Sequence, residues 1–128
     1  MPVIQVFDSR GAVYEAFRSV GEGHQSVCEW VGPEHGASYQ AGIATLEHIR
    51  IADYVFAFDD FLFVLEGAIT ITDETGSTTL KPGQAVFIPK GTRATLEVPD
   101  RLVWTYVAYG GSSNWKDTPE MPGTVEEI

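Results

Sequence analysis

The sequence has a single cysteine and no long apolar run. Cys28 cannot form a disulfide within the chain, and this is typical of a protein from a reducing compartment. The longest apolar runs, residues 54–58 and 61–65, are far shorter than the roughly 20 residues of a membrane-spanning helix. The first six residues, MPVIQV, lack the basic and long apolar regions of a secretory signal. We therefore expect a cytoplasmic protein.

Basic residues are also scarce. Eight Lys and Arg residues stand against 18 Asp and Glu residues, so the formal net charge is −10 at pH 7. A surface with this charge repels phosphate backbones and anionic lipid headgroups. The composition therefore argues against nucleic acid or a membrane as a partner.

The rest of the composition is typical of one globular β domain. The chain has 128 residues, of which 44% are hydrophobic and 20% are charged, enough to bury a single core. Thirteen Gly and seven Pro residues are spread along the chain, and 12% of the residues are aromatic. This combination favours short strands joined by tight turns, so we expect an all-β fold.

The order of apolar and turn residues predicts the elements. Residues 1–39 are expected to form strands, loops at 21–26 and 32–38, and a short helical turn within 9–19, all packed on a barrel. The barrel itself is expected over 40–110 and a tail over 111–128. Within the barrel, strands are expected at 42–51, 53–58, 61–72, 77–80, 85–88, 94–98 and 102–109, with turns at 73–76, 81–84, 89–91 and 99–101.

Two segments narrow the fold further. Residues 58–67 form a hydrophobic strand that closes on Glu-Gly, and the second segment follows the pattern G-x5-P-x-G through Gly83, Pro89 and Gly91. The missing N–H of Pro89 costs no ladder bond where a strand ends at the rim of a barrel. In this order, the two segments resemble the signature motifs of the cupin superfamily. The resemblance implies a jelly-roll β-barrel.

The resemblance also shows where metal ligands would lie. Metal-binding cupins carry H-x-H-x(3–4)-E-x6-G in the first motif and a further His three residues after the last Gly of the second. With the shorter spacer, these positions fall on Tyr54, Phe56, Asp60 and Ala94; the longer spacer moves the first two to Asp53 and Val55. A transition metal needs three or four converging N, O or S donors, which one carboxylate does not supply. We therefore predict a site without a metal or other cofactor.

One branch of the cupins is similar in further residues. The run VLEG, the turn IPKGT and the stretch from Tyr106 to Trp115 resemble the ethanolamine-utilisation protein Q family over roughly residues 40–115. Cupin domains of that family also lack the metal histidines. The resemblance implies a role in ethanolamine catabolism in bacterial microcompartments, and an acetate-kinase-type activity is attributed to the family. This chain has no Walker-type phosphate loop.

The barrel lumen is the expected binding pocket. The resemblance directs Tyr54, Phe56, Asp60 and Ala94 into it, and rings in place of imidazoles make a dry cavity suited to an organic ligand. A carboxyl group among rings has a raised pKa, so Asp60 is the candidate general acid or base. Asp59 is adjacent on the strand and should point to the opposite face. Alternatively, the rings fill the barrel as core and Asp60 meets water at its rim.

Two further strands add candidate residues. Trp104 and Tyr106 share one face of a strand; they line the cavity, with Tyr106 as a second catalytic residue that donates its hydroxyl, or they belong to the core. Glu47 and His48 interrupt an otherwise apolar strand and point to opposite faces of it, with Arg50 on the same face as His48. Either Glu47 faces the ligand, or His48 and Arg50 do. Alternatively, these charged residues lie on a solvated outer face or in a dimer contact.

The other chemically active residues carry weaker indications. His24 and His35 lie in expected loops, and Cys28 has no cationic neighbour in the sequence to lower its pKa. A metal site built from His35, Glu47, His48 and Asp60 is a minor alternative.

We predict a metal-independent homodimeric cupin that binds a small organic molecule and performs acid/base chemistry on it, of lyase, isomerase or cyclase type. Two alternatives stay open. One is a non-catalytic ligand-binding or microcompartment accessory protein. The other is a metalloenzyme, a dioxygenase or hydrolase, with ligands outside the usual motif.

Overall fold

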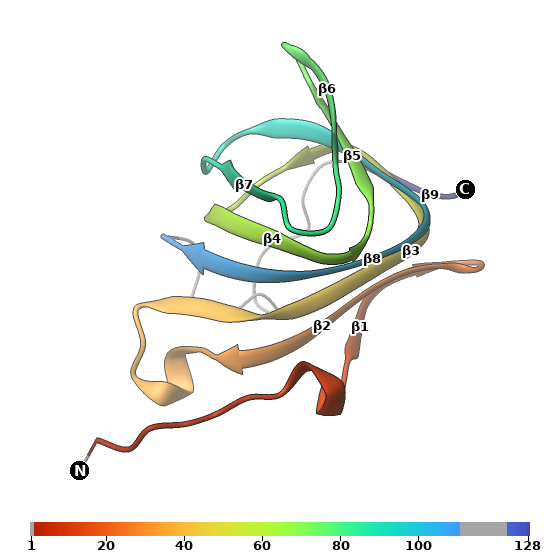
Figure 1. The fold of residues 1–128 in the computed structure, drawn as a ribbon. Helices are drawn as coiled ribbons and strands as arrows, with labels where there is room; N and C mark the ends of the chain where they lie inside the picture. Colours follow the sequence, from red (N-terminus) through yellow and green to blue (C-terminus); the bar gives the residue numbers. More distant parts are fainter. Residues whose placement is uncertain (1, 111–122) are drawn as a thin grey trace.

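A computed structural model describes residues 2–110 and 123–128 of the chain. Antiparallel strands form one strongly curved sheet that closes around an apolar interior (Figure 1). The described strands are β1 (Glu15–Val20), β2 (Gly23–Val31), β3 (Tyr39–Val55), β4 (Asp59–Gly67), β5 (Ile69–Asp73), β6 (Gly76–Leu80), β7 (Ala85–Ile88), β8 (Arg93–Tyr109) and β9 (Thr124–Glu127). The helical content of the described residues is two 3-10 turns, η1 (Ser9–Gly11) and η2 (Pro33–His35), and neither could cross a membrane. The predicted all-β class is confirmed.

Two long strands organise the sheet. β3 and β8 pair from Tyr39 opposite Tyr109 to Val55 opposite Arg93. At one end they are flanked by β2 and by β4; at the other they are flanked by β9 and by β5. β3 turns this corner at two bulges, where His48 and Asp53 have positive φ angles of 48° and 53° and the register with β8 shifts. One pair of strands therefore contributes side chains to both ends of the interior.

The N-terminal region differs from the prediction. The helical turn within 9–19 is limited to η1, and the chain then forms β1, which pairs with β2. β2 includes most of the predicted loop 21–26, whereas 32–38 is a loop with η2 as expected. A two-residue turn, in which Gly21 has a φ of 57°, joins β1 to β2. Such a turn needs left-handed backbone that glycine adopts readily.

The barrel strands are longer than predicted in two places and shorter in one. Residues 42–51 and 53–58 were expected as two strands, but β3 runs through to Val55; likewise β8 runs through the turn expected at 99–101. Pro99 is accommodated because it lies opposite the β3 bulge at His48, where ladder bonds are interrupted. The strand expected at 61–72 breaks after Gly67, which has a φ of 76°. Strands 77–80 and 85–88 are confirmed, and β6 returns antiparallel to β5.

The predicted C-terminal tail lies partly outside the described residues. That portion includes Trp115. The described end of the tail forms β9, which pairs with the second half of β3.

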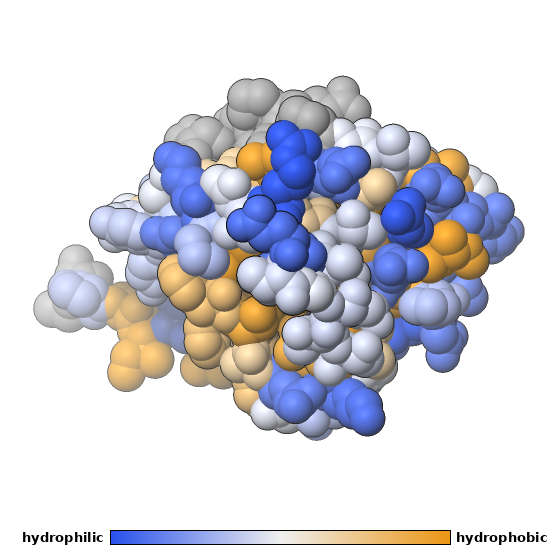
Figure 2. Space-filling model, turned by 90° about the horizontal axis from the view of Figure 1, so that it is seen from above, coloured by the Kyte–Doolittle hydropathy of each residue, from blue (hydrophilic) through white to orange (hydrophobic). Residues whose placement is uncertain are grey.

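The outer face of the sheet carries exposed aromatic residues. Phe61 of β4 lies between Phe87 of β7 and Val107 of β8 in the strand register. These three side chains are 50%, 59% and 41% exposed, and Phe63, next on the same face of β4, is 37% exposed. Figure 2 views the molecule from above and shows apolar residues gathered left of centre on a face that is otherwise largely hydrophilic. Such a patch is typical of an interaction surface.

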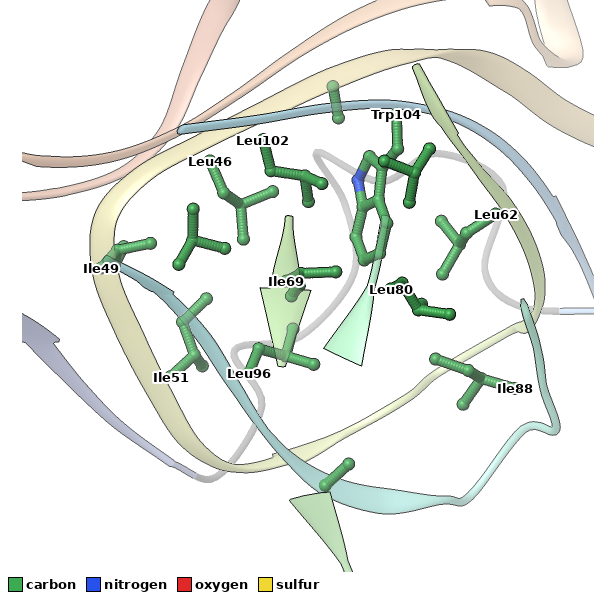
Figure 3. Packing of buried hydrophobic residues seen from close by; sticks show 14 of the residues in the cluster. Leu46, Ile49, Ile51, Leu62, Ile69, Leu80, Ile88, Leu96, Leu102 and Trp104 are labelled. Atoms are coloured by element: carbon green, nitrogen blue, oxygen red, sulfur yellow. The ribbon is translucent and has the colours of Figure 1, made fainter. Parts of the chain in front are cut away.

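Aliphatic side chains fill one end of the interior. In Figure 3, the labelled side chains Leu46 and Ile49 of β3, Ile69 of β5 and Leu102 of β8 lie together inside the ring of strands. The fully buried residues include Leu46, Ile49, Ile51, Ile69, Val98 and Leu102. All but Ile69 of β5 belong to the stretches of β3 and β8 on either side of the bulge, so this end is a packed core.

Candidate functional site

The other end of the barrel contains a cavity of about 100 Å³. Both ends of β3 and of β8 contribute to it: Gln40 and Tyr54 line it from the two ends of β3 and Leu96 and Ala108 from the two ends of β8. Its side chains therefore come from segments that are distant in the sequence. Six of the lining residues are aromatic: Phe17, Tyr54, Phe56, Phe58, Trp104 and Tyr106. The polar lining residues are Gln25, Gln40 and Asp60, and the aliphatic ones are Val27, Ala44, Leu62, Leu96 and Ala108.

Strand alternation directs Asp60 into this cavity. Asp60 and Leu62 line it from β4, opposite Ala108 and Tyr106 of β8. The neighbouring Asp59 engages a different partner: its Oδ1 accepts a hydrogen bond from the backbone N–H of Lys90 at 2.8 Å. The two carboxyl groups therefore do not share one site.

Asp60 has unusual electrostatics. Burial raises the pKa of its carboxyl group to about 7, and the negative charge of Asp59 adds to the effect. Among the described residues, Asp60 takes part in no ion pair or hydrogen bond with another side chain. Near neutral pH the group is therefore present both as the acid and as the base, the condition that proton transfer requires.

Tyr54 and Phe56 form one wall of the cavity. Their ring centroids are 4.7 Å apart with an interplanar angle of 83°. The guanidinium of Arg18, on β1, lies 5.4 Å from the Tyr54 centroid and 4.8 Å from the Phe17 centroid, and its Nε donates to Gln25 Oε1 at 3.0 Å. Burial raises the pKa of the Tyr54 hydroxyl, although Arg18 opposes this effect. The Tyr54 hydroxyl is therefore protonated at neutral pH.

Tyr106 brings a hydroxyl group to the same cavity. Its side chain crosses Gly42 of β3, where a Cβ atom would lie 2.8 Å from the hydroxyl oxygen, so glycine leaves room for it. Burial raises the pKa of this hydroxyl, and the charge of Glu29 adds to the effect. The hydroxyl is buried and has no hydrogen-bond partner among the described residues. A buried donor of this kind calls for a partner, and a ligand or water could supply it.

The structure brings together five of the eight predicted site residues: Tyr54, Phe56, Asp60, Trp104 and Tyr106 line the cavity. Ala94 lies in the apolar core and borders a separate groove of about 900 Å³ beside the β5–β6 hairpin. Glu47 and His48 do not line the cavity either.

Glu47 and His48 lie away from the cavity because β3 bends at their positions. Glu47 pairs with Arg101 and His24 in the ladders, and His48 occupies the bulge, where its carbonyl oxygen accepts a hydrogen bond from the N–H of Ile128 at 3.0 Å. Arg50, a candidate on the same face as His48, forms an ion pair in which its Nη1 lies 3.1 Å from Glu126 Oε1. Its Nε lies 3.7 Å from Glu97 Oε2. The proposed site therefore omits Ala94, Glu47 and His48.

The lining does not fit a transition metal. It offers one carboxylate and no imidazole or thiolate among the described residues, and these residues contain no group of three or more His, Cys, Asp or Glu side chains that could hold an ion. His24 instead lies 3.2 Å from Ser19, and His35 accepts from the N–H of Gly32. The set His35, Glu47, His48 and Asp60 is therefore not assembled.

Sequence reasoning missed nine of the fourteen lining residues, five of them aliphatic; the other four are Phe17, Gln25, Gln40 and Phe58. Two of these four lie on β1 and β2, which were expected as helical turn and loop. The available signal was the Gly21-Glu22 pair, which is typical of a two-residue hairpin turn.

Comparisons with known proteins agree with this architecture. The family model for the ethanolamine utilisation protein EutQ matches residues 13–117. The chain belongs to the EutQ family. The putative ethanolamine utilization protein Q of Salmonella typhimurium LT2 superposes on this EutQ-family chain with a TM-score of 0.74 and 22% identity, covering 85% of this chain and 88% of that one.

Two further relatives are informative. The polyketide cyclase RemF of Streptomyces resistomycificus superposes with a TM-score of 0.67 and 16% identity over 98% of this chain and 86% of its own. The acetate kinase EutQ of Clostridioides difficile (strain 630) is 30% identical over 57 residues, 44% of this chain. This EutQ-family chain covers 36% of that relative's length. The structural matches show the fold, and the predicted cupin barrel of EutQ type is confirmed.

Proposed function

We propose that the barrel binds a small organic molecule and that Asp60 moves a proton on it without a metal ion. One observation carries this proposal: a carboxyl group without a charged partner, with a pKa near neutrality, lies among six aromatic residues inside a barrel. Tyr106 supports it because its buried hydroxyl can donate a hydrogen bond to the same ligand.

The chemistry follows from these two groups. The carboxylate of Asp60 accepts a proton from a C–H, N–H or O–H group of the ligand, and the electron pair left behind moves into the ligand. The hydroxyl of Tyr106 stabilises negative charge that develops on a ligand oxygen. Asp60 then returns the proton at the same or another atom. This sequence suits a lyase, isomerase or cyclase step, and the structural neighbour RemF is itself named a cyclase.

Hydrogen exchange tests the proposal for a proton taken from carbon, because a C–H group, unlike N–H and O–H groups, exchanges with the solvent only when a base removes its proton. Small carbonyl and hydroxy compounds are first screened for binding by ligand-observed NMR, and each compound that binds is incubated with the protein in D2O. We expect enzyme-dependent deuterium incorporation that is lost in Asp60→Asn and reduced in Tyr106→Phe. The variant Asp100→Asn removes an exposed carboxylate of β8 and should leave the exchange unchanged. Binding without exchange would instead favour a non-catalytic ligand-binding or accessory role.

The cavity does not favour a kinase reaction. No Lys or Arg side chain of the described residues lines it, and the carboxylate of Asp60 repels phosphate groups. The name of the Clostridioides difficile relative therefore does not carry over to this cavity.

We also propose that the protein is a homodimer formed through the aromatic outer face of β4 and β7. The support is that Phe61, Phe63 and Phe87 are exposed next to one another on one face of the sheet. Aromatic residues are more frequent in interfaces than on the rest of a protein surface.

A further inference from the structure

The cavity lining also indicates the charge of the ligand. Aromatic rings carry partial negative charge on their faces, and six of them line the cavity together with Asp60, which has the single carboxyl group of the lining. No Lys, Arg or His side chain of the described residues lines the cavity. Every strong electrostatic feature of the lining therefore favours positive charge.

The rim of the cavity already binds a cation in this way. The Arg18 guanidinium lies over the rings of Phe17 and Tyr54, at 4.8 Å and 5.4 Å from their centroids. Both distances are within the roughly 6 Å at which a cation–π interaction is effective. Its hydrogen bond to Gln25 holds Arg18 beside the cavity, so the interior beyond it has room for a second positive group.

We propose that the cavity binds a small organic cation, an amine or a quaternary ammonium, with its charged nitrogen between Asp60 and the ring faces. This inference rests on the proposed function and names its substrate class. The volume of about 100 Å³ corresponds to about three water molecules at roughly 30 Å³ each, so the charged group is small. The net charge of −10 also raises the local concentration of cations.

Cation binding would act on the protonation of Asp60. Asp60 shares the cavity lining with Tyr54 of β3 and Tyr106 of β8, and the charge that acts on its carboxyl group is that of Asp59 on the same strand. The charge of Arg18 on β1 acts on Tyr54, and that of Glu29 on β2 acts on Tyr106. None of these is a cation paired with Asp60. A positive nitrogen beside Asp60 favours its ionised form, so the ligand itself converts Asp60 into the base that the proposed reaction needs.

Isothermal titration calorimetry with a matched pair of probes tests this inference. Choline is the cation, and 3,3-dimethylbutan-1-ol is the neutral molecule of the same shape, with carbon in place of nitrogen. We expect choline to bind about tenfold more tightly at pH 8. Titrations in buffers of different ionisation enthalpy should show release of about half a proton per choline bound near pH 7 and little release near pH 8.5.

Three variants complete the test, one of them a control. Asp60→Asn should lose both the preference for choline and the proton release, whereas Asp100→Asn makes the same charge change on an exposed position and should keep both. Phe56→Leu keeps an apolar side chain and should weaken choline about threefold to tenfold, with little effect on the neutral probe.

The possible failures are distinguishable. Equal binding of both probes would overturn the cation inference and leave the proposed function standing. Binding of choline without proton release would also overturn it, since Asp60 would not contact the charge. If neither probe binds at about 10 mM, the inference is wrong, and the hydrogen-exchange screen decides the proposed function separately.

Discussion

The raised pKa of Asp60 predicts a specific change in stability. In the unfolded chain this carboxyl group has its ordinary pKa near 3.8, whereas in the folded protein the pKa is about 7. Between these two values the folded state binds more protons than the unfolded state, so the contribution of Asp60 to stability falls as pH rises. Below pH 3.8 the contribution is fully present; above pH 7 it is lost, and stability is then independent of this group.

The magnitude follows from the difference between the two pKa values. A difference of about three pH units corresponds to at most about 4 kcal/mol, of which about half falls between pH 5 and pH 7. Because Asp60 is only partly buried, we expect the free energy of unfolding of Asp60→Asn, relative to the native protein, to rise by about 1–3 kcal/mol from pH 5 to pH 8.

Urea denaturation followed by tryptophan fluorescence measures this difference. Both proteins are unfolded at several values between pH 5 and pH 8, and Asp100→Asn serves as the control for the lost charge. Other titrating groups act equally on both proteins and cancel in the comparison. A difference between Asp60→Asn and the native protein that stays constant with pH would refute the reasoning, because Asp60 would then titrate alike in both states.

The fold and the assembly make further predictions. Leu46→Ala removes a fully buried side chain and should lower the free energy of unfolding by about 3 kcal/mol in urea denaturation. Gly67→Ala should cost more than about 3 kcal/mol, because the added Cβ would lie 1.7 Å from the Arg101 carbonyl oxygen; Gly83→Ala, with a φ of 89° and open space around it, should cost only about 1 kcal/mol. Light scattering should find the native protein as a dimer and Phe61→Asp as a monomer. If Phe61→Asp has the mass of a dimer, this face is not the interface. Elemental analysis of protein purified without chelator should find no stoichiometric Fe, Mn, Ni or Zn, and a bound metal at one per chain would contradict the metal-independent mechanism.

Local patterns were sufficient for part of the fold. The strand at 85–88 lies between two Pro-containing turns, and the hairpin at 77–80 follows a turn with Gly76, so short-range chemistry determines both. The motifs at residues 58–67 and 83–91 likewise indicated the barrel, because their glycine residues and Pro89 mark turns within a short segment. The continuity of β3 could not be predicted in this way, because its bends depend on positive φ angles at His48 and Asp53, and such angles are uncommon in any residue other than glycine.

The candidate site, like the fold, could be predicted only in part from the sequence. Asp60 was predicted to face inward from strand alternation and family resemblance, and the cavity lining agrees. The lining from β1 and β2 was missed for two reasons. Phe17 belongs to the local β1–β2 hairpin, whose turn at Gly21 was interpreted as part of a loop. Gln25 pairs with Leu46 of β3, and such pairing with a distant segment leaves no periodic signal in a short one. Glu47 and His48 were misplaced because a bulge interrupts the alternation on which their orientation was judged.

The division of one barrel into a filled end and a hollow end has an evolutionary consequence. β3 and β8 hold their neighbours through buried aliphatic residues such as Ile49 and Val98, while the opposite ends of the same strands present Ala44 and Ala108 to the cavity. Replacing either small residue by a larger one reshapes the chamber without disturbing the part that keeps the domain folded. Lineages built on this plan can therefore acquire new ligands by single substitutions, with little penalty to their folding.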